Sequence, residues 1–119
     1  MAGEAILLYT SDLMFSVRVR EVALNRDCTV SVVENDHDFK LRLQEVHPKL
    51  VILDLNIAGA NIESHVENCK VSESRVVVYV PHAKRDLRAR AQTAGVDAIY
   101  SSSQFKTDLV TILPSLLTE

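Results

Sequence analysis

One carboxylate stands directly after the most apolar run of the chain. Asp54 follows Leu50-Val51-Ile52-Leu53, and Pro48 and Gly59 lie on either side of this segment. Because the run is too short for a helix and is bounded by helix breakers, it predicts a strand buried on both faces of a parallel sheet. Asp54 is then expected at the carboxyl end of a central strand, where open α/β sheets gather ligands and chemistry.

The other residue types that could do chemistry form no constellation. The histidines have no metal-ligand spacing, so we predict no metal site and expect surface positions for His37, His47, His65 and His82. Two cysteines, Cys28 and Cys69, are too far apart for a redox or metal motif, and each is expected to be a small buried side chain. The chain has three glycines and no glycine-rich fingerprint, and serines 101–103 are better suited to capping a helix than to binding phosphate. We therefore predict no catalytic residues, no cofactor, no small-molecule substrate and no enzymatic activity.

Composition and charge exclude several classes of protein. The 119 residues, 47% hydrophobic and 24% charged, fit a single domain spanning 1–119 with one core. A net charge of −3 gives no overall attraction to nucleic acid or to an anionic membrane. The sequence has no apolar run of membrane-spanning length and no basic segment ahead of its first apolar run, so we expect a cytoplasmic protein that does not enter the membrane.

Hydrophobic periodicity divides the chain into alternating strands and helices. Strands are predicted at 5–9, 28–33, 50–54, 76–80 and 96–100, and helices at 12–26, 39–46, 62–70, 84–94 and after the serines at 101–103. A turn is expected at Asn35-Asp36 and a loop at 58–61, and Pro114 should end or kink the last helix because its ring clashes with the carbonyl of Val110. This order predicts an α/β fold: a flavodoxin-like (βα)5, doubly wound parallel sheet with strand order 2-1-3-4-5.

Three helices have faces that can be assigned. In the first helix the apolar positions are Leu13, Val17, Val19, Val22, Ala23 and Leu24, with Arg20 among them. In the fourth, Leu87, Ala91 and Ala94 should face inward and Lys84, Arg85 and Arg88 outward. Leu116 and Leu117 are expected to close the core, the alternative being an exposed apolar contact.

From Ala5 to Leu117 the chain resembles the receiver domain of bacterial two-component response regulators. Segment 48–59 is similar to the family's third strand and following loop, and segment 94–98 to its turn into the fifth strand. The resemblance implies that Asp54 matches the phosphoryl acceptor of the family.

The other chemical positions depart from the family pattern. The resemblance implies two acidic metal ligands where Thr10 and Ser11 stand, a hydroxyl at Val80, and a lysine at Ser102, or at Ser103 if Phe105 sets the register. Asp12 comes one place too late for a metal ligand and should cap the following helix, unless a register slip brings it into the cleft. In a working receiver the backbone carbonyl of Asn56 would face the metal ion, a role that lapses if no metal binds. We therefore predict a pseudo-receiver in which Asp54 is hydrogen-bonded to Thr10, Ser11 or loop amides. The alternative is a phosphate-switched single-domain response regulator autophosphorylated on Asp54, with Asp12 as substitute metal ligand.

A basic patch is the strongest candidate for binding. Lys84, Arg85 and Arg88 lie about one turn apart on the predicted fourth helix, which by itself could be only a solvated face. Receivers use the surface of their fourth helix, fifth strand and fifth helix to meet partners, and Tyr100, or Ile99 in an ungapped register, matches the aromatic switch position on that strand. We predict a phosphorylation-independent interaction module that binds a protein partner or its own copy there. Nucleic-acid binding through these side chains and Arg90 is disfavoured by the acidic net charge.

Overall fold

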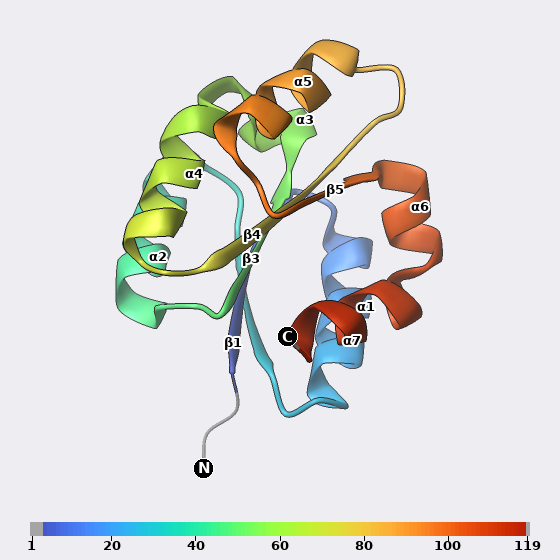
Figure 1. Ribbon diagram of the computed structural model, residues 1–119. Helices are drawn as coiled ribbons and strands as arrows, with labels where there is room; N and C mark the ends of the chain where they lie inside the picture. The colour runs from blue at the N-terminus through green and yellow to red at the C-terminus, as the bar shows by residue number, and fades with distance from the viewer. Residues whose placement is uncertain (1–3, 119) are drawn as a thin grey trace.

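In the computed structural model, which describes residues 4–118, a five-stranded parallel sheet lies between two layers of helices (Figure 1). The strands follow the order β2-β1-β3-β4-β5. Their bounds are Ala5–Tyr9 for β1, Thr29–Val33 for β2, Leu50–Asp54 for β3, Arg75–Val80 for β4 and Ala98–Ser101 for β5. The predicted doubly wound α/β fold and its strand order are therefore confirmed.

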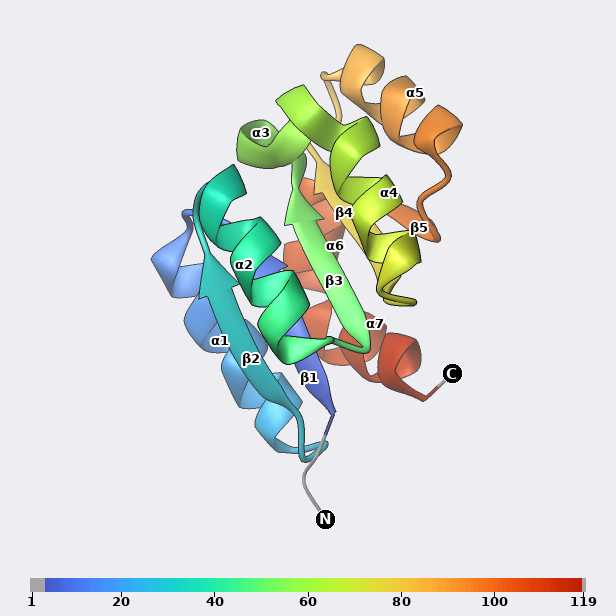
Figure 2. The same cartoon turned by 90° about the vertical axis from the view of Figure 1, so that its left-hand side faces the viewer.

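Each face of the sheet has its own helical layer. One face is covered by α1 (Leu13–Leu24), α6 (Ser102–Thr107) and α7 (Leu109–Leu117). The other is covered by α2 (Asp36–Val46), α3 (Leu55–Ala58), the short 3₁₀ helix η1 (Gly59–Asn61), α4 (Ile62–Val71) and α5 (Arg85–Ala94). Figure 2 looks at this second layer, with α1, α6 and α7 behind the sheet. Within residues 4–118, no helix combines the length and apolarity that crossing a membrane requires.

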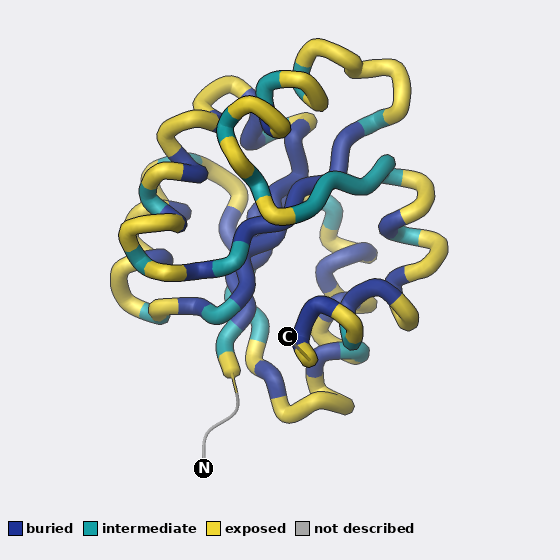
Figure 3. The backbone as a smooth tube through the Cα atoms, in the orientation of Figure 1, coloured by how far each residue is buried: buried dark blue, intermediate teal, exposed yellow. Residues whose placement is uncertain are grey.

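The core explains why Asp54 is placed so firmly. All five residues of β3 are buried, and their side chains alternate between the two helical layers, as they must in a strand. Figure 3 shows this buried centre enclosed by exposed helix surfaces. Cys28 and Cys69 are both buried and unpaired, as predicted, and Leu116 and Leu117 close the core. In α5, Ala91 is buried and Leu87 and Ala94 pack partly buried against the core, also as predicted.

The predicted apolar face of α1 is only partly correct: Val19 and Ala23 are buried as expected and Val22 is partly buried, but Phe15 was not among the predicted positions. The buried residues are Phe15, Ser16, Val19 and Ala23, whereas Leu13, Val17 and Leu24 are exposed. Positions 15, 19 and 23 form a second apolar stripe at helical spacing. This stripe faces the core because the Phe15 ring, which is larger than any side chain of the exposed stripe, packs on the rings of Tyr79 and Phe105.

Three local predictions also need correction. The expected turn at Asn35-Asp36 is instead a helix start, because the Asn35 side chain accepts a hydrogen bond from the amide of Asp38 and caps α2. The expected loop at 58–61 is helical: it follows α3, which Asp54 caps, and residues 59–61 form η1. Gly59 also lets the Leu87 side chain approach the backbone so closely that a Cβ added at residue 59 would lie 2.8 Å from it.

The last helix breaks at Asp108 and not at Pro114, which lies inside α7. The Val110 carbonyl, which the proline leaves without a helical donor, belongs to an exposed residue that water can reach.

Candidate functional site

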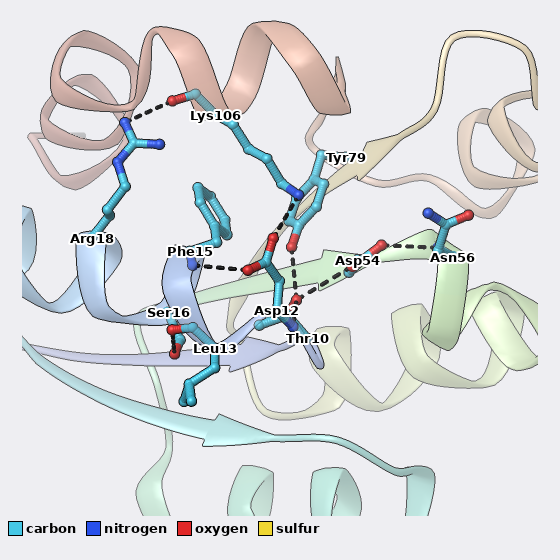
Figure 4. Close-up of polar contacts among 10 residues, drawn as sticks. All are labelled: Thr10, Asp12, Leu13, Phe15, Ser16, Arg18, Asp54, Asn56, Tyr79 and Lys106. Carbon is cyan, nitrogen blue, oxygen red and sulfur yellow. Dashed lines mark hydrogen bonds and ion pairs between the residues drawn. The ribbon is translucent and has the colours of Figure 1, made fainter.

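Asp54 ends β3 with both carboxylate oxygens in use (Figure 4). Its Oδ1 accepts a hydrogen bond from the Asn56 amide at 3.0 Å, which caps α3, and its Oδ2 accepts one from Thr10 Oγ1 at 3.3 Å. Only 7% of the residue is exposed. The contact to Thr10 was expected from the sequence, whereas the amide belongs to helix α3 and not to the expected loop; the Thr10 contact gives the carboxylate a structural role in joining β1 to β3.

The Thr10 hydroxyl is the centre of this buried network. It donates to Asp54 and accepts from the Tyr79 hydroxyl and from the Asp12 amide, both at 3.1 Å. One donor and two acceptor sites are all that a hydroxyl offers, so Thr10 has no capacity left for a ligand in this arrangement. Burial raises the pKa of Tyr79 well above its usual range, so the phenol stays a neutral donor.

Asp12 caps α1, as its late position in the sequence predicted. Its Oδ1 accepts a hydrogen bond from the Phe15 amide at 3.0 Å, and its Oδ2 lies 2.9 Å from the Lys106 ammonium. The hydrogen bond from Lys106 is the main cause of an Asp12 pKa below the usual value. The ammonium also lies over the rings of Phe15 and Tyr79, 5.4 and 5.8 Å from their centroids.

Lys106 is the site residue that the sequence analysis missed. It lies four residues after Ser102 on a helix that begins at Ser102, so the two share a face, and this spacing was the available signal. Lys106 lies one helical turn beyond Ser102, the position where the resemblance implied a lysine, and it contacts Asp12 and not Asp54.

The other residues that the sequence placed in the pocket around Asp54 do not form a common site with it. Val80 is fully buried in the core below α5, and Ser11 and Asn56 are exposed at the end of the sheet. Ser102 Oγ is buried without a hydrogen-bond partner among the described residues. Residues 4–118 contain no group of three histidine, cysteine or acidic side chains placed to hold a metal ion. With one Asp12 oxygen bound to Lys106 and the other to an amide, the donor set is poorly suited to Mg²⁺, which prefers several hard, free oxygens.

A second polar cluster adjoins the site across β1. Asp36 accepts hydrogen bonds from the Tyr9 hydroxyl and from the Asn61 amide group, and its Oδ1 lies 3.0 Å from His65 Nε2. Burial raises the pKa of Asp36, but these three partners outweigh it, so the pKa lies below the usual value. His65 is 1% exposed, which corrects the expectation that all four histidines lie on the surface. Its apolar neighbours, Tyr9 and Phe39, were not foreseeable as contacts of an isolated histidine.

The predicted basic patch is exposed and largely unpaired. In the described part of the chain, Lys84, Arg85 and Arg88 take part in no ion pair, whereas Arg90 is bound by two hydrogen bonds to Glu63, whose pKa it lowers to about 2. Arg90 therefore ties α5 to α4. Because its guanidinium is bound to Glu63, Arg90 is no longer available for the nucleic-acid contact considered from the sequence.

A groove runs beside this patch. Its volume is about 590 Å³, and it is lined by His82, Arg85, Arg88, Ser101 and Gln104.

Tyr100 and Ile99 point to opposite faces of the sheet at β5. Tyr100 is half-buried with its ring 5.3 Å from that of Phe105, and Ile99 packs with the layer that contains α5. Tyr100 thus lies against α6 at the sheet edge, whereas Ile99 belongs to the layer that contains α5.

Comparisons with solved structures identify the fold. A response regulator from Hahella chejuensis aligns with a TM-score of 0.81 over 97% of this chain and 96% of its own, at 18% sequence identity. The receiver domain of a response regulator from Bermanella marisrubri aligns with a TM-score of 0.79 over 98% and 99% of the two chains, at 16% identity. That of a DNA-binding response regulator from Colwellia psychrerythraea 34H gives 0.78 over 98% and 99%, at 20% identity.

Sequence comparisons add no family. No protein-family model matches the chain, and no curated protein sequence does. The neighbours in structure are receiver domains of response regulators, and the chain has their fold.

Proposed function

We propose that this chain is a signalling pseudo-receiver, a module that binds a protein partner without phosphorylation of Asp54. The observation that carries the proposal is the closed network at the end of the sheet. Asp54 is engaged by Thr10 and a backbone amide, and Lys106 is engaged by Asp12. Asp54 thus has partners for both carboxylate oxygens, and the Lys106 charge is paired with Asp12, without a phosphoryl group.

The physical reason concerns what phosphoryl transfer requires. The transition state spreads negative charge over the transferred oxygens, and enzymes stabilise it with metal ions, cations and hydroxyl or amide donors. Val80 provides no donor at the end of β4, and Lys106 reaches Asp12 instead of Asp54. A metal held by Asp54 and Asp12 would have to displace this ammonium first, and the chain therefore lacks an open site for the reaction.

The surface for the partner is the groove between α5 and α6. Arg85 and Arg88 make the groove positively charged on a chain whose net charge is −3, which suits an acidic segment of another protein. We place such a module in the cytoplasm, where its two buried thiols would stay reduced.

The proposal is tested by NMR and mass spectrometry on the folded protein. Amide shifts are followed as Mg²⁺ and then beryllofluoride are added, and the intact mass is measured after incubation with acetyl phosphate and Mg²⁺. We expect unmoved spectra and no phosphoryl adduct. Shifts at Asp54, Thr10 and Ser102 that spread into α5, with an adduct that Asp54→Asn removes, would establish the phosphate-switched alternative.

The groove has a separate test. We expect a peptide of eight glutamates to shift the amides of Arg85, Arg88 and Gln104, and a peptide of eight lysines to leave them in place. The double variant Arg85→Glu/Arg88→Glu should lose the response, and Arg26→Glu, at an exposed arginine just after α1, should keep it. Equal binding of both peptides, or none of the acidic one, contradicts an acidic partner.

A further inference from the structure

The outer surface of α1 carries an unusual share of exposed apolar side chains. Of the seven large apolar side chains exposed in residues 4–118, four lie on this helix: Leu13 at 74%, Met14 at 78%, Val17 at 47% and Leu24 at 73%. A fifth, Val110 at 69%, lies near the start of α7, which packs beside α1 (Figure 1). The opposite side of α1 is already buried against the sheet, so these side chains contribute nothing to the core.

The exposed residues of α1 are spaced symmetrically along the helix. Leu13, Val17, Arg20 and Leu24 are four, three and four residues apart, which places them in one stripe, with the repeat of a helix-pairing seam. If a second copy of the helix lies antiparallel across a two-fold axis between positions 18 and 19, Leu13 is level with Leu24 of that copy at both ends. Val17 is then level with Arg20 of that copy. The stripe is therefore complementary to itself.

The charges on the stripe fit the same arrangement. Arg20 and Glu21 are exposed, and neither takes part in an ion pair within the described residues. Glu21 lies one turn from Val17, so the long Arg20 side chain of the second copy can reach it, and the symmetry forms the pair twice. By contrast, a two-fold contact through the groove at Arg85 and Arg88 would place like charges against each other.

We propose that a second copy of this chain docks on the α1 stripe, defined here as Leu13, Val17, Arg20 and Leu24, in an antiparallel two-fold dimer. This surface is separate from the α5–α6 groove of the proposed function, so one chain can hold a copy and a partner at once. A helix of 12 residues is about 18 Å long, and such a contact is small beside a standard interface. The dimer is therefore weak, with a dissociation constant in the micromolar range or above.

Sedimentation equilibrium of the full chain from about 10 μM to 1 mM tests the dimer. We expect the average mass to rise from 13.3 kDa towards twice that value. Val17→Lys should weaken association at least about tenfold, because it places a second cation level with Arg20 of the other copy. Val71→Lys, at an 80% exposed apolar position on α4, is the matched control and should associate as the parent does. A parent chain that stays monomeric at 1 mM overturns the proposal and leaves the stripe to a different partner.

A charge exchange and a crosslink test the geometry. Glu21→Arg alone should weaken association, and Arg20→Glu combined with it should restore association. When Leu13→Cys and Leu24→Cys chains are mixed and oxidised, we expect a mixed dimer. Leu13→Cys alone should not crosslink, because its two copies lie eleven residues apart along the helices, about 16 Å and beyond disulfide reach. Crosslinking of Leu13→Cys with itself, or no mixed product, rules out the antiparallel arrangement.

Discussion

The buried histidine on α4 predicts how the free energy of unfolding responds to acid. Because Asp36 can only accept hydrogen bonds, the neutral His65 ring carries its proton on Nε2, 3.0 Å from Asp36 Oδ1. Its Nδ1 is buried with no partner among the described residues, so a second proton would create an unpaired buried N–H. Burial is the main cause of a His65 pKa below the usual value; the neighbouring Asp36 opposes this shift and Lys40 adds to it.

The sign of the effect follows from proton linkage. The unfolded chain has a histidine pKa of about 6.5, so below that pH it binds a proton that the folded chain does not. Stability from His65 is complete above about pH 6.5 and is lost as the pH falls towards the folded pKa, at no more than about 1.4 kcal/mol per pH unit. Asp36 also has a lowered pKa, but its contribution is lost only at lower pH, below about 4, so the two effects separate.

Urea unfolding between about pH 7.5 and 5.5 measures this slope. His65→Gln keeps an N–H donor for Asp36 but cannot titrate, so we expect it to flatten the profile even if it lowers stability at pH 7.5. His82→Gln, at an exposed histidine with no hydrogen bond or ion pair among the described residues, is the matched control and should retain the parent slope. Parent and His65→Gln profiles that remain parallel would falsify the assignment of the acid sensitivity to this ring.

Three further changes test the site and its supports. Lys106→Met frees the Asp12 carboxylate, so Mg²⁺ should shift the Asp12 and Asp54 amide signals in the variant but not in the parent. Losing this partly exposed ion pair should lower the free energy of unfolding by no more than about 1 kcal/mol. If Mg²⁺ shifts no amide of the variant either, Lys106 does not block the site. Gly95→Ala should destabilise by about 1–2 kcal/mol in urea, because residue 95 has φ +92°, and Gln92→Ala on the same helix should change stability by less than about 0.5 kcal/mol. Phe105→Ala should cost about 3–5 kcal/mol by the same measurement, and a loss below about 1 kcal/mol would contradict its packing at 0% exposure.

The fold was predictable because it depends on local patterns. Short apolar runs bounded by breakers alternate with helical periods, and few arrangements of such units bury both faces of every central strand. Asp54 could be placed for the same reason, since its position follows from the end of a strand and needs no distant contact.

The missed features depend on contacts between distant segments. In α1 two apolar stripes have helical spacing, and only the rings of Tyr79 and Phe105 decide that Phe15 faces inward. Lys106 meets Asp12 across 94 residues of sequence, and His65 meets Asp36 across 29. No period or local motif encodes such pairs, so the sequence could show which chemical groups were absent but not how the remaining ones are used.

The contacts of Lys106 also bear on how the proposed dimer would form on the α1 stripe without phosphorylation of Asp54. Asp12 begins α1 and is held by Lys106, while Arg18, further along the same helix, donates a hydrogen bond to the Lys106 carbonyl at 2.8 Å. One residue of α6 thereby fixes the first two turns of α1, where the stripe begins. Groups that would neutralise a phosphoryl charge in a reactive site here hold two helices in register. The orientation of the proposed dimer surface is thus set by folding itself, so docking would need no signal at Asp54.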